Sequence, residues 1–180
     1  MEKIILHACC AVCMAHPIEL LKENYQPVVF FYNPNIYPES EYLRRRDELI
    51  KYCEKMDYEY LIGDYDPEKW YVYISGLEQE PEKGLRCNKC FSFRLEKTAQ
   101  KAVELGIKKF TTTLTVSPHK VSKNIFAQGR DIAAKYKLEF LDIDFKKNNG
   151  FLKSMEISKD NDFYRQQYCG CEFSIRKGTK

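Results

Sequence analysis

Cysteines gather at three places in this chain, and their spacing is typical of metal or redox chemistry. Six of the eight cysteines form tight clusters, which are Cys9-Cys10, the pair Cys87 and Cys90, and Cys169-Gly170-Cys171. Cysteines that merely fill a core are not expected to pair in this way. Thiol clusters at the ends of predicted elements, in a chain with no recognisable export signal, favour metal binding or thiol chemistry over a disulfide scaffold.

The Cys-x-x-Cys pair places two sulfurs one helical turn apart. A helix is predicted from about Cys87 to Leu105, so both thiols lie near its N-terminus. There, free amides and the helix dipole lower a thiol pKa and stabilise thiolate charge. Arg86, Lys89 and Arg94 would add compensating positive charge.

Two of the clusters together could supply a complete set of metal ligands. Four thiolates, from Cys9, Cys10, Cys87 and Cys90, suit either tetrahedral zinc or an iron–sulfur cubane. Two adjacent cysteines converge with difficulty on one small ion, whereas a cubane presents separate iron corners. On this ground the four residues are predicted to hold a [4Fe-4S] cluster.

The other thiols leave more than one interpretation open. Cys13 could be a further ligand, a thiol that faces the substrate or a small packed side chain, and a packed or neighbouring role is favoured. Cys53 lies on the apolar face of a predicted helix and is expected only to pack. Cys169 and Cys171 could form a small, strained and easily reduced disulfide, or bind a second metal.

Histidines and aspartates near predicted strand ends are further candidates. His119 stands beside a lysine, and it could cap a loop, donate a proton or contact a phosphate. His7 and His16 flank the first cysteines and are expected to pack or to hydrogen-bond. Asp64 and Asp66 are more typical of turn residues than of metal ligands.

Composition places the chain among globular proteins. With 180 residues, 44% of them hydrophobic and 14% aromatic, residues 1–180 are expected to form a single metallocluster-binding α/β domain with its own core. No apolar run approaches ~20 residues, and Ile4 to Leu6 is too short for the apolar part of a signal peptide. The protein is therefore expected in the cytoplasm, away from any membrane, where thiols stay reduced.

Charge gives only a weak indication of partners. The net charge of +3 is too small to indicate nucleic-acid binding by itself. Solvated lysines and arginines are the better interpretation of any one basic run. The runs that could still make a local basic face are Arg44 to Arg46, Lys108-Lys109, Lys146-Lys147 and the tail from Arg176 to Lys180.

Strands and helices alternate in the predicted secondary structure. Runs rich in β-branched and aromatic residues predict five strands, at 4–10, 27–32, 58–62, 109–116 and 138–143. Helices are predicted at 17–24, 38–56, 87–105 (ended by Gly106) and 123–136. The segment 63–84 is expected to be irregular and the chain after Asp144 polar, with cysteines at its end. The alternation predicts a doubly wound, mostly parallel α/β sheet.

Ligands in such sheets gather at the carboxyl ends of the strands. Four loops with unusual chemistry follow predicted strands, and they are expected to converge on one edge. These loops contain Cys9-Cys10, Asn33 and Asn35, Gly63 to Asp66, and Ser117 to Lys120.

Long segments of the chain, taken in order, resemble one known family. HACCAVC, VVFFYNPNIYP, GDYDPEKW, GLRCNKCFSFRLEKTA, TTTLTVSPHK and YRQQYCGC together resemble the QueH-type epoxyqueuosine reductases, from the first strand to Cys171. That family is similar in fold to the Rossmann-like adenine-nucleotide hydrolases and PP-loop enzymes. This chain has Ala8-Cys9-Cys10-Ala11 where PP-loop enzymes have a glycine-rich phosphate loop, so no nucleoside triphosphate site is expected. Val12, where many relatives have proline, bears little on the chemistry.

The resemblance implies reduction of epoxyqueuosine to queuosine in tRNA, a reaction that takes two electrons and releases water. The implied partners are tRNA carrying epoxyqueuosine and an electron donor that the sequence does not identify. The implied cluster ligands are Cys9, Cys10, Cys87 and Cys90, and the implied redox-active pair is Cys169 and Cys171.

An iron–sulfur cluster delivers one electron at a time, so a two-electron reduction needs a second store. The Cys169/Cys171 dithiol, or an additional single iron near it, could be that store. The epoxide oxygen also needs a proton or a Lewis acid as its C–O bonds break, and His119 is the candidate proton donor.

Two other functions fit the same cysteines. One is a zinc-binding RNA-binding module without catalysis, which iron and sulfide content would separate from a reductase. The other is a generic thiol–disulfide oxidoreductase that uses Cys87 and Cys90. Such an enzyme would be free of metal as isolated and would leave Cys9-Cys10 without a role.

Overall fold

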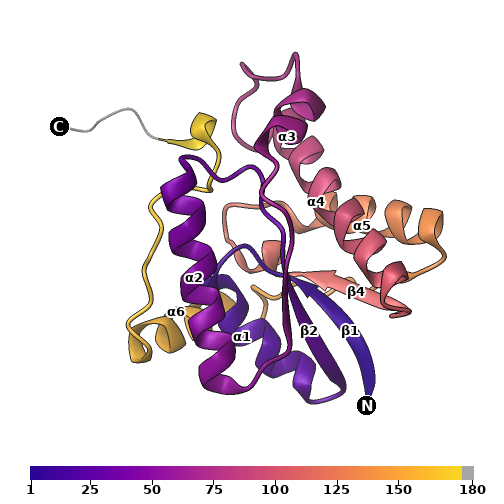
Figure 1. Cartoon of the computed structure of the whole chain (residues 1–180), viewed down its shortest axis with the longest axis vertical. Helices are drawn as coiled ribbons and strands as arrows, with labels where there is room; N and C mark the ends of the chain where they lie inside the picture. Colours follow the sequence, from indigo (N-terminus) through magenta and orange to yellow (C-terminus); the bar gives the residue numbers. More distant parts are fainter. Residues whose placement is uncertain (176–180) are drawn as a thin grey trace.

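The computed structural model describes residues 1–175, in which five parallel strands form one sheet with helices on both faces (Figure 1). The strands are β1 (Glu2–His7), β2 (Tyr25–Phe31), β3 (Tyr60–Ile62), β4 (Lys109–Thr112) and β5 (Glu139–Phe140). Their order in the sheet is β3-β2-β1-β4-β5, and every neighbouring pair is parallel. The predicted doubly wound sheet is confirmed. Its order reverses between β1 and β4, which is where such sheets open a crevice for ligands.

Helices cover the sheet on both sides. They are α1 (Ala11–Lys22), α2 (Glu39–Met56), α3 (Pro67–Ile74), α4 (Leu85–Glu104), α5 (Ser122–Tyr136) and α6 (Gly150–Asp160), with 3₁₀ turns η1 (Thr113–Val116) and η2 (Glu172–Ser174). In Figure 1, α1, α2 and α6 lie on one side of the sheet, and α4 and α5 lie on the other. The chain after α6 runs back along α2. No helix among the described residues combines the length and apolarity needed to cross a membrane.

Buried side chains of β1 alternate between the two faces, as a parallel sheet covered on both sides requires. Ile4 and Leu6 point into the core beneath α1 and α2, and Ile5 points into the core beneath α4 and α5. Cys53 lies in the first of these cores with no exposed surface. The prediction that Cys53 packs is therefore confirmed.

The region around the first cysteines differs from the sequence prediction. β1 ends at His7, so Ala8 to Cys10 form a loop and not the end of the strand. The Cys10 sulfur accepts the backbone N–H of Cys13 at 3.3 Å, and this N-cap contact begins α1 directly after Cys10. Pro17 lies inside α1. Because proline is common at the start of a helix and rare inside one, the sequence predicts a helix that begins at Pro17, whereas α1 begins at Ala11.

Other boundaries also differ. The segment predicted as irregular contains α3, which buries Trp70 and Ile74. The fourth strand ends at Thr112, whose hydroxyl accepts the N–H of Leu114 at 3.2 Å as the chain turns into η1. The fifth strand has only two residues. The polar chain after Asp144 contains α6, which packs against α1.

Candidate functional site

Three cysteine sulfurs meet where β1 gives way to α1. Cys9 and Cys10 lie in the loop, Cys13 lies in the first turn of α1, and their Sγ atoms all lie within 4.8 Å of one another. Cys9 Sγ is 3.9 Å from Cys10 Sγ and 3.8 Å from the Thr113 hydroxyl. Within residues 1–175 this is the only group of three or more thiol, imidazole or carboxylate side chains gathered so tightly. Cys13 thus stands among the candidate ligands, although the sequence favours a packed or neighbouring role for it.

Of these three thiols, only one has a pKa that favours the negatively charged thiolate. Hydrogen bonds from Cys10 and Cys13 hold the pKa of Cys9 well below its ordinary value. The contact with Cys13 lowers the pKa of Cys10, but the hydrogen bond to Cys9 and burial outweigh it and raise that pKa to about 12. Hydrogen bonds to Cys10 and Cys9 raise the pKa of Cys13 well above its ordinary value. Cys9 is therefore the first thiolate of the group.

A buried arginine brings positive charge to these thiols. Arg94, on α4, is 2% exposed; its Nη1 donates to Asn33 Oδ1 and its Nε to the Cys90 carbonyl, both at 3.3 Å. Asn33 in turn donates to the Ala8 carbonyl at 2.9 Å, so α4 is tied to the loop that carries Cys9. Burial alone would lower the pKa of Arg94, but the negative charges of Cys90, Cys169 and Cys9 raise it. Arg94 is thus tied by hydrogen bonds to the Cys90 carbonyl and, through Asn33, to the loop that carries Cys9.

His7 joins β1 to β4 and to the residue that follows β2, so it hydrogen-bonds within the fold as predicted. Its Nε2 donates to the Tyr32 carbonyl at 3.1 Å, and its Nδ1 therefore accepts the Thr112 hydroxyl at 2.9 Å. Burial lowers the pKa of His7 to about 4, so the imidazole is neutral near pH 7. Burial also lowers the pKa of His16, which lies 8% exposed on α1.

The Cys-x-x-Cys pair lies on α4 as predicted, but its electrostatics differ from the prediction. Cys87 is half-buried in the first turn, and its sulfur accepts the Lys83 N–H at 3.3 Å. Cys90 is buried with Trp70 and Cys171 in a small apolar cluster. Burial raises the pKa of both thiols, which the Lys83 N–H at Cys87 and the Arg94 charge at Cys90 only partly oppose. Desolvation therefore exceeds the expected effect of the helix N-terminus.

One cavity of about 470 Å³ brings the cysteine clusters together. Cys9 and Cys13 line it from the β1–α1 loop side, Cys87 from α4, and Cys169 from the C-terminal segment. The loop from Ser117 to Lys120 also lines it, as predicted. All four predicted loops follow parallel strands and therefore lie at the carboxyl edge of the sheet, as predicted. Asn33, Asn35 and the loop from Gly63 to Asp66 are nevertheless not among the residues that line the cavity. Further polar side chains on its wall are Asn88, Asn124, Arg165, Gln166 and Gln167.

The two C-terminal thiols face different surroundings. Cys169 is exposed and lines the cavity, whereas Cys171 is buried beside Cys90 and Trp70. Burial raises the pKa of Cys171, whose sulfur lies 3.6 Å from the Ser174 hydroxyl. All eight cysteines of the sequence fall within the described residues, where each is a free thiol.

The remaining predicted site residues have varied places. His119 is exposed on the cavity wall, and its backbone N–H donates to the Ser117 hydroxyl at 3.3 Å. Lys120, beside it, is partly buried; burial lowers its pKa, but its electrostatic interaction with Cys169, Cys9 and Cys13 outweighs this and raises it. Asp66 directly precedes α3, and its carboxylate accepts the Tyr32 hydroxyl and Lys69 Nζ, both at 2.9 Å, so both of its oxygens are paired within the fold.

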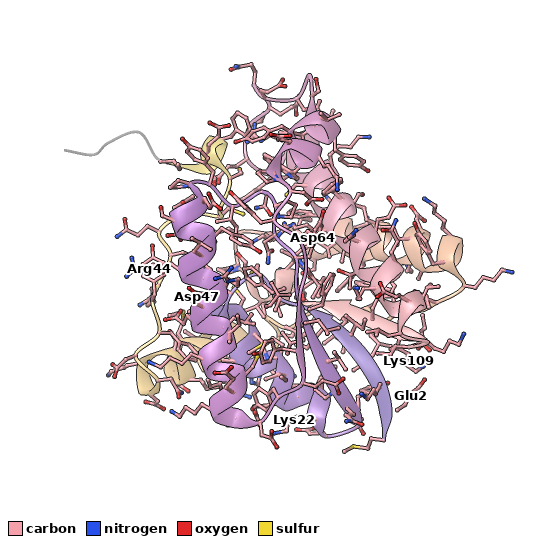
Figure 2. The ribbon with its side chains drawn as sticks, in the orientation of Figure 1. Glu2, Lys22, Arg44, Asp47, Asp64 and Lys109 are labelled. Carbon is pink, nitrogen blue, oxygen red and sulfur yellow. The ribbon has the colours of Figure 1, made fainter. Side chains whose placement is uncertain are left out.

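The basic runs do not form one face. Arg45 is 1% exposed, so it cannot contact a phosphate, while Arg44 beside it is exposed. Lys109 is the first residue of β4, so it lies at the amino end of the strands, away from the carboxyl end that carries the cavity. It pairs with Glu139. Figure 2 shows Lys109 beside Glu2, away from Arg44 and Asp64. The tail from Arg176 to Lys180 lies outside the described residues.

Two residues in contact with the cysteine clusters are not identified by sequence reasoning. Arg45 donates to the Cys169 carbonyl at 3.1 Å, and Gln166 donates to the Cys10 sulfur at 3.0 Å. A position inside a basic run conceals the first. The second lies within YRQQYCGC, but nothing in the sequence indicates its contact.

Solved structures establish the class of fold. The chain resembles a predicted subunit of a tRNA methyltransferase from Methanocaldococcus jannaschii (TM-score 0.57, 9% identity, 78% of this chain and 66% of that one). It also resembles the U34-tRNA thiolase NcsA from Methanococcus maripaludis, a structure with its [4Fe-4S] cluster (TM-score 0.57, 13% identity, 97% and 61%). At such identities the likeness concerns the fold alone. That fold is a doubly wound, parallel α/β sheet.

Sequence comparison gives the family. The family model described as epoxyqueuosine reductase QueH matches residues 4–177. The chain is 42% identical over 179 residues to epoxyqueuosine reductase QueH of Streptococcus pyogenes serotype M1, covering 96% of this chain and 70% of that protein. It is 36% identical over 178 residues to the protein of that name from Thermotoga maritima, covering 97% and 91%. The chain belongs to the epoxyqueuosine reductase QueH family.

Proposed function

We propose that this protein is an oxidoreductase of tRNA modification that reduces epoxyqueuosine in tRNA to queuosine. In this reaction the two C–O bonds of the epoxide break and a carbon–carbon double bond forms. Two electrons and two protons are taken up, and the oxygen leaves as water. The site must therefore supply electrons and a proton at the oxygen, and must admit a modified base.

The observation that carries this proposal is the cavity bordered by thiols from all three clusters. Its volume, about 470 Å³, lies within the range of roughly 300–1,000 Å³ that is usual for small-molecule sites. A single nucleoside turned out of an RNA strand fits a space of this size. Cys9 and Cys87 on its wall belong to the proposed cluster site, and Cys169 belongs to the proposed redox pair.

The chemistry of the donors fits a [4Fe-4S] cluster. Thiolates are its usual ligands, and the proposed ones are Cys9, Cys10, Cys87 and Cys90. Cys13 is then the neighbour whose backbone N–H supports the Cys10 sulfur. The positive charge of Arg94 beside these thiols favours a negatively charged group. When bound, the cluster supplies single electrons.

Residues on the cavity wall would complete the reaction. Cys169 faces the cavity, and with Cys171 it forms the dithiol that we assign as the second store of electrons; an additional single iron beside the pair is the alternative store. His119 is assigned as the proton donor to the epoxide oxygen. Lys120 beside it keeps positive charge near the oxygen as the C–O bonds break.

The substrate is proposed to be tRNA and not the free base, in the cytoplasm. Exposed Lys83 and Arg165 line the cavity and would hold phosphates at its mouth. Arg44 is exposed, and its guanidinium stacks on the ring of Tyr164, the residue before Arg165, 3.5 Å from the ring centroid.

Anaerobic reconstitution tests the proposal directly. The protein should take up iron and sulfide in near-equal amounts, and with a chemical reductant it should convert epoxyqueuosine in tRNA to queuosine, detected by mass spectrometry of the digested nucleosides. Stoichiometric zinc without sulfide and without turnover would favour a non-catalytic RNA-binding module. A metal-free protein that only exchanges disulfides would favour a generic thiol oxidoreductase.

A further inference from the structure

Arg45 is the buried centre of a polar network that reaches the C-terminal thiols. It lies in the middle of α2, 1% exposed, and its Nε donates to Glu41 Oε1 at 2.7 Å. Its Nη1 donates to the Cys169 carbonyl at 3.1 Å, and its Nη2 to the Tyr168 carbonyl at 3.3 Å. A buried ion pair contributes little net stability, because desolvation offsets most of its attraction. Stability alone therefore does not account for this arginine.

The segment that Arg45 holds is fixed at three successive carbonyls. Arg45 binds those of Tyr168 and Cys169, and the Tyr37 N–H donates to the carbonyl of Gly170 at 2.8 Å. The Tyr168 ring also faces the guanidinium, with its centroid 5.3 Å away. The backbone on both sides of the Cys169 side chain is thus bound to the region around α2.

The partner of Arg45 is itself held by the same segment. Glu41 accepts Nε of Arg45 through one carboxylate oxygen and the Tyr164 hydroxyl through the other, at 3.0 Å. The Glu41–Arg45 ion pair on α2 therefore contacts the C-terminal segment at two places. Glu41 binds the Tyr164 hydroxyl, and Arg45 binds the carbonyls of Tyr168 and Cys169. A planar guanidinium can bind a carboxylate and two carbonyls at once, which a lysine ammonium on its flexible stem cannot reproduce.

Gly170 lets the backbone approach this network closely. Its φ is +140°, and a Cβ there would lie 3.3 Å from Arg45 Nη1 and 3.2 Å from Ile36. The chain therefore passes close to Arg45 at Gly170, and the cysteines on either side of this glycine have different surroundings. Cys169 faces the cavity and Cys171 is buried beside Cys90.

We propose that Arg45 is a positioning residue, which holds Cys169-Gly170-Cys171 so that one thiol faces the cavity while the other stays buried beside Cys90. Arg45 does not line the cavity itself, so it does not touch the substrate. Its charge also lies near the Cys10 and Cys9 thiols, and a lysine at this position keeps that charge while losing the hydrogen bonds to the segment. The inference rests on the proposed function, in which the two thiols are the redox pair.

Thiol labelling of the reconstituted protein tests this inference. In Arg45→Lys, the rate at which iodoacetamide modifies Cys171 should rise about tenfold or more, because hydrogen bonds to a charged group are lost. Cys53, fully buried in the main core, should stay unmodified and so exclude global unfolding. Iron and sulfide content should be unchanged, and kcat should fall about tenfold with KM for tRNA unchanged. Arg46→Lys is the matched control, because Arg46 pairs with Asp47 and should leave every reading unchanged.

The other outcomes separate the two proposals. Unchanged Cys171 labelling in Arg45→Lys would overturn the positioning role whatever the activity. Faster labelling with normal kcat would also overturn it if Cys169→Ala is inactive, since the pair would then work without its fixed geometry. If Cys169→Ala also turns over normally with a chemical reductant, the pair serves at most the natural electron donor, and the effect on kcat expected here has no basis. Should Arg45→Lys fail to fold, Gly170→Ala, which presses on Arg45 from the loop side, should give the same labelling and kcat changes.

Discussion

Gln166 donates its side-chain amide to the Cys10 sulfur, with Nε2 and Sγ 3.0 Å apart, although 156 positions separate the two residues in the chain. Cys10 also accepts the backbone N–H of Cys13 at 3.3 Å. The C-terminal segment therefore contacts the first cysteine cluster through Gln166 and α2 through Cys169. One short stretch of chain joins the proposed ligand site to the proposed redox pair.

Loss of the Gln166 amide should make the bound cluster harder to reduce. Hydrogen bonds to the sulfurs are among the factors that set the potential of an iron–sulfur cluster, because they stabilise the more negative, reduced state. Gln166→Leu removes one such bond, so the potential measured by a spectroscopic redox titration should shift to more negative values at unchanged iron content. Gln167→Leu, which changes an exposed neighbour on the same cavity wall, should leave the potential unaltered. Equal potentials in the two variants would show that Gln166 has no such effect.

Local sequence patterns predict the sheet and the helix-borne thiols well. β-branched and aromatic runs identify every strand of the described chain, and the Cys-x-x-Cys pair lies in α4 as expected. Prediction is weaker where a side chain decides the local structure. Cys10 caps α1 with its sulfur, and Thr112 turns β4 into η1 with its hydroxyl. Neither contact can be predicted from the spacing of residue types in the sequence.

The parts of the site that sequence does not predict are long-range contacts of polar side chains. Arg45 belongs to a run of three arginines that suggests a surface, yet it is buried against carbonyls 123 and 124 positions away. Burial also reverses the expected pKa of Cys87, because the desolvation of a thiolate depends on elements packed from elsewhere in the chain. Such effects follow from the fold and not from local periodicity.

Substitution of Cys13 should distinguish a ligand from a neighbour. If Cys9, Cys10, Cys87 and Cys90 are the ligands, each replacement by serine should remove most of the iron and sulfide. Cys13→Ser should then retain both, since its backbone N–H to Cys10 is preserved. Iron and sulfide analysis after anaerobic reconstitution gives the answer. Loss of the cluster in Cys13→Ser, with retention in Cys90→Ser, would place the fourth ligand in the first cluster.

Cys53 should matter for stability alone. Cys53→Ala removes a small side chain from the core and should lower the free energy of unfolding by about 1 kcal/mol, with cluster content and turnover unchanged. Cys53→Ser should cost more, because it buries a hydroxyl that has no partner in an apolar environment. Chemical denaturation measures both changes. A folded Cys53→Ala protein without a cluster would contradict the assignment.

Binding to tRNA should depend on salt through the cations at the cavity. Each lost phosphate contact should lower the slope of log affinity against log salt concentration by about 1. Lys83→Ser and Arg165→Ser should each do so and weaken binding, whereas Lys109→Ser should not, since Lys109 lies at the opposite edge of the sheet. Filter binding over a range of salt concentrations tests this. Activity that is independent of salt and equal on the free base would indicate a small-molecule enzyme.

Cys169 and Cys171 should be needed for electron delivery and not for holding the cluster. Four thiolates already satisfy the four irons of a cubane. Of the two C-terminal thiols, Cys169 is exposed and Cys171 is buried. Cys169→Ala and Cys171→Ala should therefore keep full iron and sulfide and still bind modified tRNA, but lose turnover.

Metal and activity must be measured together in these two variants, because each result has a separate meaning. Loss of iron with sulfide retained would indicate a single iron beside the pair in place of a dithiol store. Loss of both, with Cys9 or Cys10 replaceable, would reverse the ligand assignment. Normal turnover of both variants with a chemical reductant would restrict the pair to the natural electron donor. Because Cys171 lies buried beside Cys90 while Cys169 faces the cavity, we expect Cys169→Ala to abolish turnover even with a chemical reductant.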